Sequence, residues 1–161
     1  MNTLTAWKFH DPGGAEQALE RLQALASEGL ISVDDAALVT WPTTRRRPHT
    51  RELGSLTGPG ALWGGGFGMV LGLIFVAPLA GLAAGAATGA VAGSLADHGI
   101  DDDFVATVRE RVTPGTSALF LLSHGAMVDR VAAEMADLEM DLVRSNLDPD
   151  QERRLRAALV G

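Results

Sequence analysis

The chain has 161 residues, a formal net charge of −7 and no cysteine. This length suits one domain with an insertion, and it is long enough to bury a hydrophobic core. The acidic balance argues against a nucleic-acid partner, and the lack of thiols excludes disulfides, thiolate metal sites and cysteine nucleophiles. The start, MNTLTAWKFHDPGG, lacks the basic and apolar parts of a signal peptide, so we expect the N-terminus in the cytoplasm.

The first 52 residues combine charged residues with apolar periodicity. The pattern predicts a strand over residues 4–9, a helix over 15–28 that ends at Gly29, and a strand over 35–41 that ends at Pro42. Arg45, Arg46 and Arg47 follow as a short basic run. Such a run is typical of a solvated loop, and contact with a phosphate or a lipid headgroup is the alternative.

Residues 53–96 contain no Asp, Glu, Lys, Arg or His and hold 12 of the 19 glycines. Eight glycines recur at every fourth position, in two series: Gly60, Gly64, Gly68 and Gly72, then Gly81, Gly85, Gly89 and Gly93. Pro78 lies between the series, and proline suits a turn or the first turn of a helix. The block therefore predicts a glycine- and alanine-rich helical hairpin with arms over about 60–76 and 79–95.

The regular glycines predict close packing between helices. A residue at every fourth position stays near one face of a helix, and each glycine costs about 1 kcal/mol of helix propensity relative to alanine. Eight such positions imply a compensating gain, as in the small-xxx-small pattern of membrane helix pairs. We expect these eight glycines to pack hairpins from several chains into a homo-oligomer.

Three environments for the hairpin remain open. It can lie in a membrane, form the core of a soluble assembly, or act as a flexible linker, which the regular spacing and the alanines disfavour. Each arm would be about 25 Å long, against a hydrocarbon core of about 30 Å. The preceding arginines would hold that end in the cytoplasm. We expect lipid as a partner and the inner membrane as the location, with the α/β domain in the cytoplasm; a cytoplasmic location is the alternative.

Residues 97–161 return to the composition of a soluble domain. They predict a helix over 101–112 capped by Asp101, a strand over 117–123, a helix over 127–138, a strand over 139–145 and a helix over 149–160. With residues 1–52, this order predicts an α+β fold: a ferredoxin-like sandwich with a four-stranded sheet and helices on one face. Residues 1–52 and 97–161 would form this domain, and 53–96 the inserted glycine-zipper hairpin.

No group of residues predicts a catalytic, cofactor or metal site. The four histidines lack the spacing of metal ligands: His10, His49, His98 and His124. The acidic residues beside His98 could form a loose cation site, but helix capping is the better interpretation. The glycines over 64–66 lack the Lys-Ser/Thr of a phosphate loop, and the Ser123-His124 pair lacks a third group to orient a base. Arg153, Arg154 and Arg156 fit a solvated helix face, or else a partner surface.

The stretch GALWGGGFGMVLGLIFVAPLAGLAAGAATGAVAGSLADHGIDDDFV, followed by VTPGTSALFLL, resembles the bacterial domain-of-unknown-function family 1269. The shared features are the glycine-zipper hairpin with a proline at its turn, the DHGIDDDF-like segment and the PGTSALF-like strand. The resemblance covers nearly the whole chain and is most specific over about 58–123. It implies a predicted membrane protein with an inserted hairpin, and it implies no activity and no functional residues.

These observations favour a non-enzymatic structural or interaction protein that self-assembles through its hairpin at or in the inner membrane. A soluble homo-oligomer with the hairpins as its core is one alternative, and partition between membrane and supernatant would separate the two. A small-ligand sensor is another alternative, based only on analogy of fold.

Overall fold

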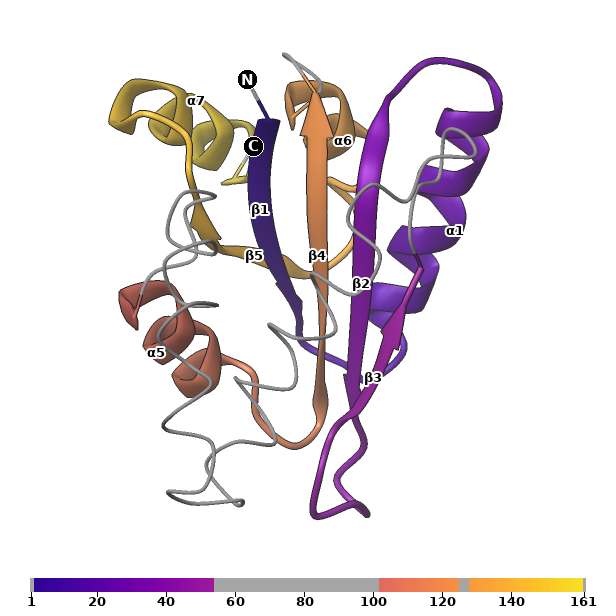
Figure 1. The fold of residues 1–161 in the computed structure, drawn as a ribbon, viewed down its shortest axis with the longest axis vertical. Helices are drawn as coiled ribbons and strands as arrows, with labels where there is room; N and C mark the ends of the chain where they lie inside the picture. The colour runs from indigo at the N-terminus through magenta and orange to yellow at the C-terminus, as the bar shows by residue number, and fades with distance from the viewer. Residues whose placement is uncertain (1, 54–101, 125–127, 161) are drawn as a thin grey trace, which may run out of the picture.

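The structure, a computed structural model, describes residues 2–53, 102–124 and 128–160. The expected hairpin, with all eight glycines of the two series, lies outside the described residues, as do Asp101 and His98. The described elements are, in chain order, β1 (Asn2–Phe9), α1 (Gly14–Ser27), β2 (Val33–Trp41), β3 (His49–Glu52), α5 (Asp102–Arg111), β4 (Thr116–His124), α6 (Val128–Glu134), β5 (Met140–Ser145) and α7 (Pro149–Val160) (Figure 1).

All five strands belong to one antiparallel sheet with the order β3-β2-β4-β1-β5. The centre of the sheet is β4, which follows the glycine-rich block in sequence and lies between two strands that precede it. Phe120 on β4 is in register with Ala6 on β1 and with Ala37 on β2. The segments on the two sides of the block therefore contribute to a single sheet.

The predicted α+β class is confirmed, but the sheet has five strands where four were expected. The additional strand is β3, whose sequence HTRE has no apolar residue and therefore resembles a loop. Its pairing with β2 places Ala37 opposite Glu52 and Thr40 opposite His49, and the Leu53 N–H continues the pairing to the Ala36 carbonyl at 2.9 Å. Backbone hydrogen bonds to β2, rather than side-chain burial, account for this strand.

The sheet carries a hydrophobic core on both faces, whereas the expected arrangement had helices on one face. Side chains of α1, α6 and α7 pack on the first face, the α1 face, against Trp7, Leu119 and Leu121. Side chains of α5 pack on the second face, the α5 face, against Leu4 and Phe120. Phe104 and Val108 of α5, with Val112 directly after the helix, are spaced by four residues and make one apolar stripe in this core.

Glycine ends α1 as predicted. Gly29 has a φ of +70°, a conformation that other residues adopt with strain. Its N–H donates to the carbonyl of Ala26 at 3.0 Å, and the next N–H, of Leu30, donates to the carbonyl of Leu25 at 2.9 Å. These two bonds form a Schellman motif, and they turn the chain toward β2.

The C-terminal helices differ in how well their ends were predicted. Asp148 caps α7, because its Oδ1 accepts the N–H groups of Asp150 and Gln151 at 3.0 and 2.9 Å, and Pro149 takes the first helical position. In contrast, α6 ends at Glu134 rather than at residue 138. The bond from the Leu138 N–H to the Met135 carbonyl, at 3.0 Å, spans three residues, so the chain leaves the helix through a tighter turn.

Candidate functional site

The PGTS segment, residues 114–117, leads into β4 and connects this strand to the start of α1. Ser117 is fully buried, and its hydroxyl donates to the Asp11 carbonyl at 2.7 Å and accepts the Ala15 N–H at 3.0 Å. Ala15 belongs to the first turn of α1, where backbone N–H groups have no partner within the helix. One hydroxyl from β4 therefore fixes both the β1–α1 loop and the start of α1.

Hydrogen bonds between Thr113 and Thr116 close the turn that precedes Ser117. The hydroxyl of Thr116 donates to the Thr113 carbonyl at 2.6 Å and accepts the Thr113 N–H at 3.1 Å. Gly115 has a φ of +89°, and its N–H donates to the Trp41 carbonyl at 2.6 Å. The conformation of Gly115 favours glycine, and its bond joins this turn to the end of β2.

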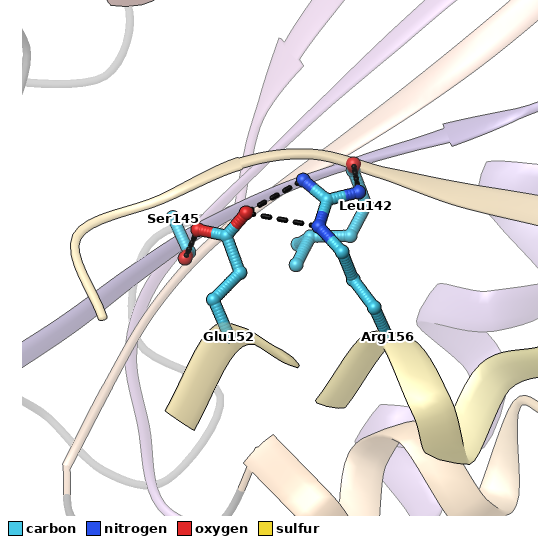
Figure 2. A network of polar contacts seen from close by, with 4 residues as sticks. All are labelled: Leu142, Ser145, Glu152 and Arg156. Atoms are coloured by element: carbon cyan, nitrogen blue, oxygen red, sulfur yellow. Dashed lines mark hydrogen bonds and ion pairs between the residues drawn. The ribbon is translucent and has the colours of Figure 1, made fainter. Parts of the chain in front are cut away.

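A polar network attaches α7 to the edge strand β5 (Figure 2). Arg156 donates through Nε and Nη2 to one carboxylate oxygen of Glu152, at 2.9 and 2.7 Å, and through Nη1 to the Leu142 carbonyl at 3.0 Å. The Ser145 hydroxyl donates to the other oxygen of Glu152 at 2.8 Å. Burial raises the pKa of Glu152, but the hydrogen bonds from Arg156 and Ser145 outweigh it, so this pKa lies below its ordinary value.

The sequence predicts Arg156 on a solvated helix face or on a partner surface, and it does not single out Glu152. The Glu-x-x-x-Arg spacing is a recognisable signal for an ion pair within a helix. The contacts with Ser145 and Leu142 carry no such signal, because they depend on how α7 folds back on β5.

A second ion pair joins α1 to the turn after α6. Arg21 contacts both carboxylate oxygens of Asp137, with 2.8 Å between Nη2 and Oδ2. Its Nη1 also donates to the Glu134 carbonyl at 3.0 Å. The hydrogen bonds with Arg21 lower the pKa of Asp137, and the pKa of Arg21 is raised by the same contact. Arg21 is partly exposed and Asp137 largely exposed, so the pair orients α1 and α6 more than it stabilises them.

One pocket lies at the end of the sheet where α1 turns into β2. It holds about 10 Å³, roughly the space of one water molecule. The Thr5 hydroxyl on its wall already accepts the indole N–H of Trp7 at 2.9 Å. The lining residues are Thr5, Trp7, Ile31, Ser32, Val33, Leu121, Ser123 and Val131. A cavity of this size is far too small for an organic ligand or a cofactor.

The residues considered for chemistry are dispersed where the structure describes them. His10 pairs with Asp141 at 2.9 Å, between exposed side chains. His49 is exposed on β3, and Ser123 is buried in the pocket wall. Within residues 2–53, 102–124 and 128–160, no group of three or more His, Asp or Glu side chains is placed to hold a metal ion.

The eight glycines predicted to pack helices, Gly60, Gly64, Gly68, Gly72, Gly81, Gly85, Gly89 and Gly93, lie outside the described residues. Of the helices in the described parts of the chain, none combines the length and the apolar character that crossing a bilayer requires.

The profile of the family "Protein of unknown function (DUF1269)" matches residues 61–160, which include α5, β4, α6, β5 and α7. The match is shorter than the nearly whole-chain extent expected from the sequence, and it leaves out β1, α1, β2 and β3. A search of curated proteins and a search of solved structures gave no match. Because the matched range is more than half of the chain, the resemblance is confirmed: this protein belongs to the DUF1269 family.

Proposed function

We propose that this protein is a non-enzymatic structural component that assembles into a homo-oligomer through the glycine-zipper hairpin over residues 53–96, in or at the cytoplasmic membrane. The observation that carries the proposal is the pair of four-glycine series in a block without any charged residue. Regular small residues allow helix backbones to approach closely, and dispersion contacts along that line drive association. The α/β domain would then be a cytoplasmic unit carried by the assembled hairpins.

The organisation of the described domain supports this division of roles. Taking β4 and β5 as the third and fourth strands, the four principal strands have the order 4-1-3-2, and α1 and α6 are the crossovers. We therefore propose a ferredoxin-like core, extended by β3, α5 and α7. The glycine-rich block separates β3 from α5, and the strands on its two sides still pair directly. An insertion at this point is compatible with a complete sheet.

The sheet edges also favour assembly through the block rather than through strand pairing. At one edge, β3 is only four residues long and carries charge, with Arg51 bound to Glu16 on α1 at 2.6 Å. At the other edge, the guanidinium of Arg156 donates a hydrogen bond to the Leu142 carbonyl of β5. Short, charged or covered edges discourage the addition of a strand from another chain.

The test compares substitutions on and off the glycine line. Gly85→Leu and Gly68→Leu place a large side chain on the line, whereas Ala83→Leu lies about 200° around the helix from Gly85 and is the matched control. We expect both glycine variants to lose the oligomer in detergent solution and Ala83→Leu to keep it. Protection of the α1 and β4 amides against hydrogen exchange reports whether the α/β domain stays folded. An unchanged oligomer in both glycine variants would refute the assembly mechanism.

Membrane association has its own test, which is flotation of the full chain with a carbonate wash. Carbonate-resistant flotation supports a hairpin embedded in lipid. A single large species that stays in the supernatant would refute the membrane part, and would assign the glycines to the core of a soluble assembly.

A further inference from the structure

The basic run after β2 lies in a loop that neighbours the turn after α5, and the last turn of α5 carries two further arginines. We define the basic end as Arg45, Arg46 and Arg47 in the β2–β3 loop together with Arg109 and Arg111 in the last turn of α5. All five arginines are exposed. The two segments that carry them, residues 42–48 and 109–115, contain one acidic residue, Glu110, although the chain as a whole has a net charge of −7.

The fold brings these two segments together. Thr116 at the start of β4 is in register with Trp41 at the end of β2, and the Gly115 N–H donates to the Trp41 carbonyl at 2.6 Å. A Cβ placed on Gly115 would lie 3.1 Å from Cγ2 of Thr43, so the turn after α5 contacts the β2–β3 loop directly. Figure 1 shows this end of the sheet opposite the end where α7 lies.

The loop that presents the arginines has a defined shape. The Arg45 N–H donates to the Pro42 carbonyl at 3.0 Å, and the indole N–H of Trp41 donates to the Arg45 carbonyl at 3.1 Å. These bonds hold the backbone, so the side chains of Arg46 and Arg47 extend from a fixed turn. Other arginines of the described regions, such as Arg21 and Arg156, neutralise carboxylates, whereas no ion pair between described residues involves Arg45, Arg46 or Arg47.

We propose that the basic end is a docking surface for the anionic phospholipid headgroups of a membrane. The inference rests on the proposed membrane association. The uncharged block begins at residue 53, a few residues after Arg47, so a membrane that holds this block would bring lipid phosphates close to the arginines of the β2–β3 loop. Basic segments beside a membrane segment are attracted to anionic headgroups.

The absence of cysteine allows the orientation to be measured with single labels on the full chain. A fluorophore on Thr44→Cys reports on the basic end, and one on Gln151→Cys reports on α7; both positions are exposed. Vesicles of phosphatidylcholine, alone or with about 30% phosphatidylglycerol, carry an energy acceptor on the headgroups. On the anionic vesicles we expect more energy transfer from position 44 than from position 151, and a loss of this difference at high salt.

Charge substitutions complete the experiment. We expect Arg46→Gln/Arg47→Gln to lower the preference for anionic over neutral vesicles about 10- to 30-fold. Arg153→Gln/Arg154→Gln removes two exposed, consecutive arginines at the other end and should leave the preference close to that of the wild type. An unchanged preference in the first variant, or equal transfer from the two labels, overturns the docking surface. Binding of a short DNA duplex that is lost in the first variant also overturns it, in favour of nucleic acid.

The outcomes separate the two proposals. If the wild-type chain floats with both kinds of vesicle and resists carbonate, but the labels give equal transfer, the docking surface fails and the membrane association stands. If the chain floats with neither, both fail.

Discussion

Arg156 and Glu152 lie one turn apart on α7, and their ion pair is part of the contact that holds this helix to β5. The same guanidinium that binds the Glu152 carboxylate donates to the Leu142 backbone carbonyl at 3.0 Å. Among the α7 side chains that the structure describes, Leu155 is the one in the hydrophobic core. The polar network therefore acts together with Leu155 in positioning α7.

The Glu152 network predicts a dependence of stability on pH. The pKa of Glu152 is lower in the folded protein than in the unfolded chain. Its stabilisation is therefore complete above the ordinary glutamate pKa of about 4.3, and is lost as the pH falls through the lowered pKa of the folded state. Glu152→Gln should lose less than about 1 kcal/mol at neutral pH and show a flatter stability profile below about pH 4.3.

Urea unfolding at a series of pH values measures this difference. Arg153→Gln is the control, because it removes a charge at an exposed position of the same helix. An acid profile of Glu152→Gln that matches the wild type would show that the network does not contribute to the stability of the domain.

Ser117 offers a second prediction, which concerns a buried hydroxyl. Ser117→Ala would leave the Asp11 carbonyl and the Ala15 N–H without this partner, and unsatisfied buried groups cost about 1–3 kcal/mol. Ser27→Ala is the control, since its exposed hydroxyl bonds only to the Ala24 carbonyl of its own helix, and its effect should stay within about 0.5 kcal/mol. Equal free energies of unfolding for the two variants, measured in urea, would show that the hydrogen bonds of the Ser117 hydroxyl do not stabilise the domain.

Gly13, the N-cap of α1, and Gly14, its first residue, give a matched pair of substitutions. A Cβ on Gly14 would lie 2.6 Å from the Cβ of Phe9, which is fully buried and has no room to move. A Cβ on Gly13 would lie 3.3 Å from a carboxylate oxygen of Asp11, whose exposed side chain can shift. Gly14→Ala should therefore cost about 1–3 kcal/mol, and Gly13→Ala close to nothing. Thermal unfolding distinguishes them, and a similar Tm for both would contradict the packing argument.

Most of the described elements could be predicted because each has a local cause. Leu19 and Leu22 repeat with the helical period, Gly29 ends that helix, and Asp148 with Pro149 starts α7, so these elements follow from a few neighbouring residues. The strand β3 could not be found in this way. Its residues carry no apolar pattern, and it exists because β2 offers a free row of backbone groups.

The contacts that organise the domain are the part that the sequence could not predict. Ser117 binds Asp11 across 106 positions of the chain, and Arg21 binds Asp137 across 116. No local sequence pattern predicts such pairs, because each pair depends on how two elements distant in sequence are placed relative to one another. The helix propensity and periodicity that located α1 and α6 therefore carried no information about the contacts between them.

The attachment of α5 gives the last prediction. Phe104 is buried on the α5 face, and its ring lies 6.4 Å from that of Phe120 on β4, centroid to centroid, in a tilted arrangement. Phe104→Ala should cost about 3–5 kcal/mol, whereas Val105→Ala, at the partly buried neighbouring position, should cost about 1 kcal/mol or less. Because α5 is the helix that packs on this face among the described elements, its release would uncover apolar side chains of β1 and β4. Hydrogen exchange would show lost protection in α5 while the amides of α1, on the opposite face, stay protected; retained protection in α5 would mean that Phe104 does not hold the helix.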